Sequence, residues 1–166
     1  MKKRILTEAS GSLVSAYLIR AIKESGNVAI ASDIDKNNHG YCLADDFIEM
    51  PLSNDPELWS KIEKKLIERK VDMVIPSFDE TLMGWSKRKQ YFYKKGINII
   101  ISDSDSLEIY LDKYKAFKFC KLHNVPTPKT SLSQEYKIVK PRFGRGGSGI
   151  YIGDEKKDMK NMISQE

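Results

Sequence analysis

The chain has 166 residues, 40% of them hydrophobic and 31% charged, which fits one domain or one domain with part of a second. No apolar run approaches the roughly 18 residues that a membrane span needs, and no signal peptide is expected, because no apolar core follows the basic start at 1–4. The two cysteines, Cys42 and Cys120, cannot form a disulfide framework, so a reduced, cytoplasmic setting is expected.

The net charge of +5 is unevenly distributed along the chain. Residues 1–112 hold 16 Lys and Arg against 18 Asp and Glu, whereas residues 113–166 hold 12 against 5. A basic half suggests an anionic partner, either a nucleic acid or a polyphosphate nucleotide. A solvated surface would give the same count, so the charge alone does not decide.

The first 105 residues alternate short apolar runs with segments of helical spacing. Runs typical of buried strands lie at 4–7, 28–31, 47–48, 71–76 and 98–101. The strands are short and continuously apolar, and helices separate them, which is the pattern of a parallel sheet covered on both faces. We therefore expect a doubly wound, Rossmann-like α/β domain over residues 1–105.

Capping residues mark the helices between these strands. Ser12 is expected to cap the first helix, with Leu13 and Tyr17 on the face that repeats at three and four, and Gly26 is expected to end it. The next helix opens at Pro56, and a third runs from about residue 80 to Gly96.

A different pattern begins near residue 106. Two helical segments meet near Asp112, and the second runs to about His123, before a turn that contains two prolines. A strand at 137–140, a glycine-rich loop and a strand at 150–152 follow, and we expect a polar helix after them. We assign residues 106–166 to the start of a second, incomplete domain.

The segment Gly144–Gly149 matches G-x-G-x-x-G, a pattern that is weak without its context. A dinucleotide site needs these glycines to open a helix, whereas here a strand follows, so an NAD site is not expected. A β-hairpin of this kind can still hold phosphate through its backbone N–H groups, with Lys140 and Arg145 adding positive charge. The alternative is a mobile surface hairpin.

The turn after the first strand gives a second, weaker match to a dinucleotide site. Gly11 lies 22 residues before Asp33, which is the spacing of a ribose-binding acid. Gly11 has no further glycines beside it, and no Walker A sequence occurs in the chain. The sheet is therefore expected to have this fold without that ligand.

Three stretches together resemble the ATP-grasp superfamily, and within it the carbamoyl-phosphate synthase large-subunit-like proteins. They are Val74-Ile75-Pro76-Ser77-Phe78-Asp79-Glu80, then Asp112-Lys113-Tyr114-Lys115 with the later Asn124-Val125-Pro126-Thr127-Pro128, and Ile138 to Gly149. The resemblance covers essentially the whole chain, and its third stretch is the most specific. It implies a pre-ATP-grasp domain followed by the first subdomain of an ATP-grasp fold.

The resemblance also implies a set of nucleotide-binding residues. Lys113 corresponds to the first basic residue that contacts the nucleotide, and Lys140 to the second, which reaches the phosphates from its strand. Gly146, Gly147 and Ser148 lie in the flexible loop that folds over the β- and γ-phosphates. A lysine suits this role because it presents a compact positive charge.

Enzymes of this superfamily use ATP to phosphorylate a carboxylate or carbamate, which an amine then attacks. The resemblance places the ligands of the magnesium ion, and the ribose-binding acid, in a later part that this chain lacks. We therefore expect a chain that is inactive alone, because metal charge is central to phosphoryl transfer. It is either a fragment, which we prefer, or one product of a split gene, and the possible protein partners are a second copy in a homodimer or a split partner chain.

Two weaker features remain. Asp79 and Glu80 follow a strand end, where α/β sheets place ligands, but Ser77-x-x-Glu80 also reads as a capping box. The pairs His39/Cys42 and Cys120/His123 resemble zinc ligands, yet they lie in different expected units, so no metal site is predicted.

Two functions compete with the ligase. A non-catalytic nucleotide-binding or interaction module would share the fold. Nucleic-acid binding through the basic half would show a steep salt dependence, and it is not the expected partner.

Overall fold

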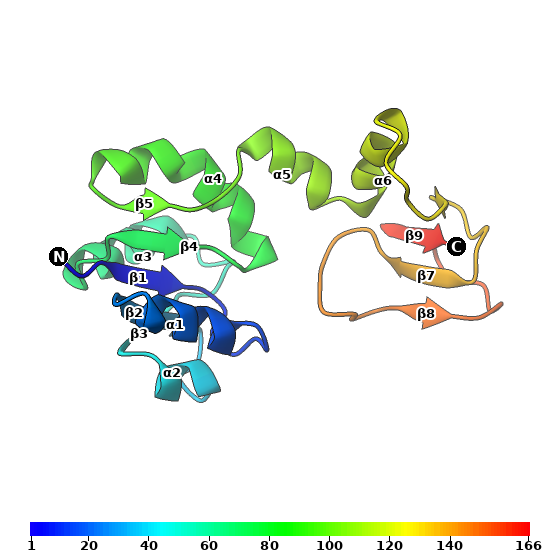
Figure 1. The fold of residues 1–166 in the computed structure, drawn as a ribbon. Coiled ribbons are helices and arrows are strands. Elements are labelled where there is room, and N and C mark those ends of the chain that lie inside the picture. Colours follow the sequence, from blue (N-terminus) through cyan, green and yellow to red (C-terminus); the bar gives the residue numbers. More distant parts are fainter. The chain divides into compact units, whose positions relative to one another are not determined.

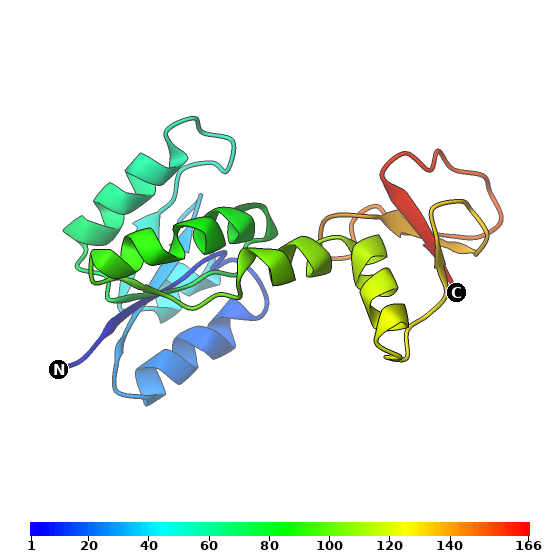
Figure 2. The ribbon, with the colours of Figure 1, turned by 90° about the horizontal axis from the view of Figure 1, so that it is seen from above.

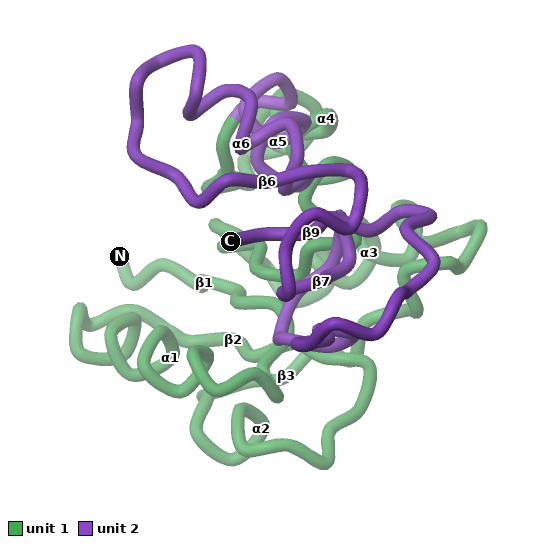
Figure 3. Tube along the Cα trace, turned by 90° about the vertical axis from the view of Figure 1, so that its right-hand side faces the viewer, with its two compact units in different colours: residues 1–102 green, residues 103–166 purple.

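The computed structural model describes residues 1–166, which divide into two compact units, 1–102 and 103–166 (Figure 3). Each unit has its own sheet, five-stranded in the first and four-stranded in the second. None of the helices combines the length and the apolar character that crossing a membrane would require.

The first unit is built on a parallel sheet with the strand order β3-β2-β1-β4-β5 (Figure 1). Its strands are β1 (Arg4–Thr7), β2 (Val28–Asp33), β3 (Asp46–Glu49), β4 (Met73–Ile75) and β5 (Asn98–Ile99). All four strand pairings are parallel. The predicted doubly wound α/β architecture is confirmed, and the strand order reverses between β1 and β4.

Helices cover both faces of this sheet. In Figure 2 the blue helix α1 and the blue-green helix α3 lie on opposite sides of it. The helices are α1 (Ser15–Glu24), α2 (His39–Leu43), α3 (Leu58–Glu68) and α4 (Asp79–Lys94). One core packs α3 and α4 against Leu6, Ile30 and Val74, and the other packs α1 against Ile5 and Ala29. Neighbouring residues of one strand thus serve opposite faces.

The first helix differs from its prediction. It starts at Ser15, its N-cap position makes no side-chain hydrogen bond, and the expected face is exposed, with Leu13 at 89% and Tyr17 at 77%. The residues that it buries are Ser15, Ile19 and Ile22. Ser15 is buried because its hydroxyl donates to the backbone oxygen of Ser10, 2.6 Å away, which an apolar pattern cannot reveal.

Glycine ends two of these helices as expected. Gly26 and Gly96 follow α1 and α4 with φ of +80° and +81°, the left-handed conformation in which a Cβ is unfavourable. The short helix α2 was not expected. The side chain of its N-cap residue, Asn38, accepts a hydrogen bond from the Tyr41 N–H, which stabilises its first turn.

The second unit has two helices and an antiparallel sheet with the order β6-β9-β7-β8. The elements are α5 (Ser104–Tyr110), α6 (Lys113–Leu122), β6 (Thr130–Ser131), β7 (Ile138–Pro141), β8 (Tyr151–Ile152) and β9 (Met162–Gln165). The helices and β7 lie where the sequence predicts them.

The predicted final helix is wrong, because the chain ends in β9, which pairs with both β6 and β7. Ile163 and Ser164 are fully buried, and their strand supplies the middle of the sheet. The charged residues before it gave the polar pattern that suggested a helix. Backbone hydrogen bonds to two distant strands decide the conformation instead, and a local pattern does not contain them.

Candidate functional site

The glycine-rich segment 142–150 joins β7 to β8, which pair antiparallel with Ile138 opposite Ile152 and Val139 opposite Tyr151. Its residues from Phe143 to Ile150 are all exposed, so Arg145, Gly146, Gly147 and Ser148 lie on the surface. No helix begins at Gly146, where a dinucleotide fingerprint would require one.

Glycine is required at both ends of this loop, for different reasons. Gly144 has a φ of +97° with open space around it, so only its backbone conformation excludes a side chain. At Gly149 φ is +72°, and an added Cβ would also lie 2.9 Å from Cγ of Pro141. The loop therefore leaves and rejoins the sheet in conformations that L-residues with side chains rarely adopt.

The start of the loop is bound to the start of α6 by an ion pair. Arg142 donates from Nε to Oδ1 of Asp112 at 2.7 Å and from Nη2 to Oδ2 at 2.6 Å. Asp112 is only 2% exposed. Its Oδ1 also caps the helix by accepting hydrogen bonds from the N–H groups of Tyr114 and Lys115, so one carboxylate serves both elements.

Burial alone would raise the pKa of the Asp112 carboxyl. The hydrogen bond from Arg142 and those from the helix N–H groups outweigh it, so the pKa lies below its ordinary value of 3.8. Asp112 is therefore ionised at neutral pH and balances the charge of Arg142.

Lys113 lies at the base of the same loop. Its ammonium group donates to the backbone oxygen of Gly144 at 2.8 Å, and its backbone N–H donates to the oxygen of Arg142 at 3.1 Å. The first residue of α6 is therefore next to the loop, thirty-one positions away in the sequence.

Lys140 occupies the strand that leads into the loop. It is half-buried on β7, and its ammonium group donates to the side-chain oxygen of Gln165 on β9. Gln165 in turn donates to the hydroxyl of Thr130 on β6, 3.0 Å away. Lys140 is thus the first residue of the short segment 140–144, and Lys113, at the start of α6, contacts its last residue, Gly144.

Asp79 and Glu80 belong to the first unit, where they form the acidic first turn of α4. Negative charge there favours the helix dipole. The expected capping box is wrong, because the N-cap residue is Phe78, which makes no side-chain cap, and the Ser77 hydroxyl donates instead to the backbone oxygen of Glu8 at 2.8 Å. The distant partner satisfies the hydroxyl that the cap would have used.

Glu8 itself is a buried acid to which the sequence assigned no role. It follows β1 and is 5% exposed. Its carboxylate accepts hydrogen bonds from Trp85 Nε1 at 2.7 Å, from the Thr81 hydroxyl at 3.1 Å and from the Ser77 N–H at 3.3 Å. Burial raises the pKa of the Glu8 carboxyl, although these hydrogen bonds act to lower it.

The turn after β1, which resembles part of a dinucleotide site, is bound by a side chain of the same unit. Asp33, at the end of β2, accepts a hydrogen bond from the Gly11 N–H at 2.8 Å. The acid that the spacing likened to a ribose ligand therefore binds the turn of its own chain.

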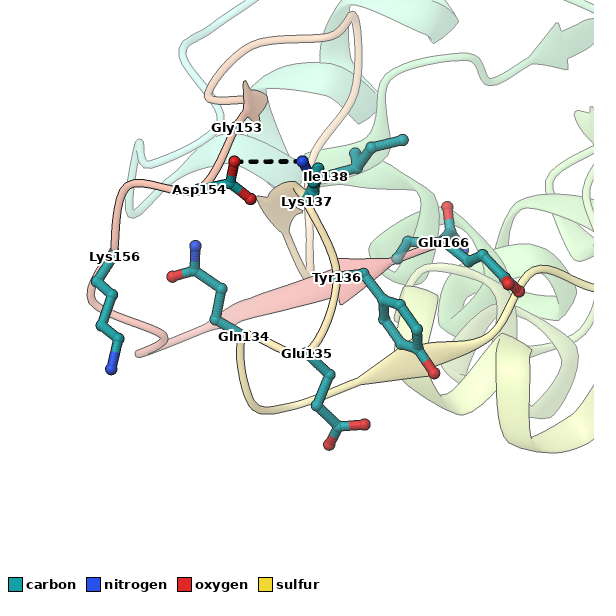
Figure 4. A pocket seen from close by; sticks show the side chains of 10 residues that line it. Gln134, Glu135, Tyr136, Lys137, Ile138, Gly153, Asp154, Lys156 and Glu166 are labelled. Carbon is teal, nitrogen blue, oxygen red and sulfur yellow. Dashed lines mark hydrogen bonds and ion pairs between the residues drawn. The ribbon is translucent and has the colours of Figure 1, made fainter.

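A hollow of about 580 Å³ lies in the second unit (Figure 4). Its wall includes Tyr136, Ile138 and the ion pair of Lys137 with Asp154, whose atoms are 3.2 Å apart. None of the eight predicted site residues lines it. Gln165, the partner of Lys140, does line it, so the hollow adjoins the sheet of the candidate loop.

The Cys/His pairs do not form a metal centre. His39 and Cys42 belong to the first unit and Cys120 and His123 to the second, and both cysteines are free. No group of three or more His, Cys, Asp or Glu side chains could hold a metal ion.

No protein-family model and no curated protein matches the sequence. Solved structures do match it. N5-carboxyaminoimidazole ribonucleotide synthetase from Thermotoga maritima is 20% identical over 99% of this chain and 46% of its own length, with a TM-score of 0.66. N5-carboxyaminoimidazole synthetase from Staphylococcus aureus, complexed with ADP, is 14% identical over 100% and 48%, with a TM-score of 0.68.

The biotin carboxylase domain of Hydrogenobacter thermophilus 2-oxoglutarate carboxylase is a third match. It is 22% identical over 92% of this chain and 37% of its own, with a TM-score of 0.63, and that structure is a dimer in complex with MgADP, ADP and bicarbonate. This chain spans less than half the length of each of the three. They are ATP-grasp enzymes, and the chain has the fold of their N-terminal part.

Proposed function

We propose that this chain is the nucleotide-binding N-terminal part of an ATP-grasp ligase, one that activates a carboxylate or carbamate by phosphorylation for attack by an amine. Residues 1–105 serve as the pre-ATP-grasp domain and residues 106–166 as the start of the ATP-grasp domain. The observation that carries this proposal is the exposed loop 143–149, with Lys113 at its base and Lys140 on the strand before it.

The chemistry of the loop supports ATP as the ligand. Successive residues with positive φ, Gly146 and Gly147, turn the backbone so that N–H groups can face an anion, and both are exposed. The ammonium group of Lys113 contacts the backbone oxygen of Gly144 in the loop, and that of Lys140, on the strand before the loop, contacts Gln165. A triphosphate carries negative charge that complements these ammonium groups.

The acceptor substrate is proposed from the similar enzymes. Bicarbonate is present in the Hydrogenobacter structure, which favours a small carboxylate or carbamate for this chain as well. A carbamoyl-phosphate synthase-like reaction is the specific form that we propose. Asp79 and Glu80 are the proposed substrate contacts in the first unit. Phosphoryl transfer requires a metal ion, which residues outside this chain would hold, and the protein is proposed to act in the cytoplasm.

Calorimetry with ATP and a non-hydrolysable analogue tests the proposal. Replacing Lys113 or Lys140 with alanine removes a charge-assisted contact of about 1.5–3 kcal/mol, so we expect roughly tenfold to hundredfold weaker binding. Lys121→Ala is the control, because it removes the same charge from the exposed last turn of α6. Equal affinities in all three variants, or no ATP binding by the unmodified chain, would refute the proposal.

A further inference from the structure

We infer that Asp112 and Arg142 form the fixed anchor of the loop 143–149, a positioning pair that determines where Lys113 and the loop N–H groups meet a polyphosphate. The nucleotide part of this inference rests on the function proposed above. The anchoring part does not, because it follows from contacts within the second unit.

The first step is that the side chain of Arg142 is held by both oxygens of Asp112. Both of its donors to Asp112 are within 2.7 Å, and a two-pronged hydrogen bond fixes the plane of the guanidinium as well as its position. Asp112 cannot follow a moving loop, because its Oδ1 is also bonded to two N–H groups of α6.

The second step concerns the backbone of Arg142. Its N–H donates to the oxygen of Asn161 at 2.9 Å, and its oxygen accepts from the Lys113 N–H at 3.1 Å. Residue 142 is therefore held through its side chain and through both of its backbone groups. The exposed residues start at the next position, Phe143, so the boundary between the fixed and the exposed chain lies at this peptide bond.

The third step separates anchoring from ligand binding. The positive charge of Arg142 is balanced by a carboxylate that is ionised at neutral pH. A phosphate would have to compete with that carboxylate for the same donors. Arg142 is therefore suited to hold the loop, whereas Lys113, whose ammonium group donates to the backbone oxygens of Arg142 and Gly144, is suited to meet the ligand.

Asp112→Asn tests the anchor with little effect on the helix, since asparagine also caps helices but cannot accept both bonds from the guanidinium. A protease that cuts after arginine reports the release of Arg142 from Asp112, because a side chain bound to Asp112 cannot enter the specificity pocket of the protease. We expect cleavage after Arg142, relative to cleavage after Arg145 in the same loop, to rise about tenfold.

Asp103→Asn is the matched control. Asp103 caps α5 by accepting a hydrogen bond from the Ser106 N–H, as Asp112 caps α6. The control should leave the cleavage ratio unchanged. A ratio that is equally unchanged in Asp112→Asn overturns the anchor.

Nucleotide affinity tests the positioning role. Asp112→Asn and Arg142→Lys, which keeps the charge but loses the fork, should each weaken ATP binding about tenfold, while Asp103→Asn does not. If the unmodified chain binds ATP and both variants bind it equally well, the positioning role is overturned. If the unmodified chain binds no ATP, the proposed function fails, and the cleavage ratio still decides whether the anchor exists.

Discussion

Trp85 donates a 2.7 Å hydrogen bond from its indole nitrogen to the carboxylate of Glu8, and both side chains are buried in the first unit. This bond joins the end of β1 to the middle of α4. The strand order reverses between β1 and β4, and Glu8 lies at the carboxyl end of β1. In α/β proteins the ligand crevice forms at this position, so the bond stabilises that end of the sheet.

Stability should depend on pH through Glu8. Burial raises the pKa of its carboxyl above the ordinary 4.5, so the folded protein holds this proton more tightly than the unfolded chain. The contribution of Glu8 to the free energy of unfolding is full below pH 4.5 and is lost as the pH rises through the raised pKa. The slope between the two values approaches about 1.4 kcal/mol per pH unit.

Urea unfolding of the native chain and of Glu8→Gln, at several pH values, isolates this effect from the other carboxyls. The stability of the native chain minus that of Glu8→Gln should fall as the pH rises above 4.5. A difference that rises or stays constant would show that the carboxyl is not destabilised by its burial.

Thr7→Val should stabilise the protein. The Thr7 hydroxyl is buried without a hydrogen-bond partner, and valine has nearly the same shape without the polar atom. Removing an unsatisfied polar group is expected to gain about 1–2 kcal/mol. Thr81→Val is the matched control and should lose stability, because that hydroxyl contacts the Glu8 carboxylate at 3.1 Å. Chemical denaturation of both variants gives the comparison.

Gly84→Ala should destabilise α4, although alanine is the better helix former by about 1 kcal/mol. An added Cβ would lie 2.0 Å from Cζ2 of Trp59, which packs edge-on against Trp85. Overpacking of this kind costs about 1–3 kcal/mol. Gln90→Ala, at an exposed position of the same helix, should be neutral or stabilising. Thermal unfolding measures both variants, and a Gly84→Ala protein as stable as Gln90→Ala would contradict the prediction.

Gly149→Ala and Gly147→Ala separate two causes of strain in the loop. Both residues have positive φ, +72° and +75°, so each substitution costs roughly 1–2 kcal/mol of backbone energy if the conformation is kept. Only at Gly149 would the new Cβ also meet Pro141, 2.9 Å away. Hydrogen exchange should therefore show a larger change at the β7 end for Gly149→Ala, and equal changes would exclude the proline contact as a cause.

Much of the architecture follows from the sequence. Short apolar runs gave all five parallel strands, and Gly26 and Gly96 gave two helix ends, because these features depend on burial and backbone geometry within a few residues. The strand β9 did not follow from it. Its four residues are held by pairing with strands 21 to 35 positions earlier, and local spacing carries no information on such pairing.

The candidate site divides in the same way. Lys113, Lys140 and the glycines of 144–149 form a recognisable motif, so the sequence predicted the loop as a candidate site. The bond between Asp112 and Arg142 spans thirty positions, and Glu8 resembled an ordinary polar turn residue. A single sequence shows neither relationship, since both depend on which elements the fold brings together.

The bond from Gly11 to Asp33 bears on redesign of the first unit. A carboxylate attached to the same chain competes for that N–H at an effective concentration on the order of millimolar, before any diffusing anion arrives. Grafting additional glycines into the turn would not by itself create a cofactor pocket. Asp33 would have to be replaced first, because its carboxylate already accepts the hydrogen bond from the Gly11 N–H that a cofactor would need.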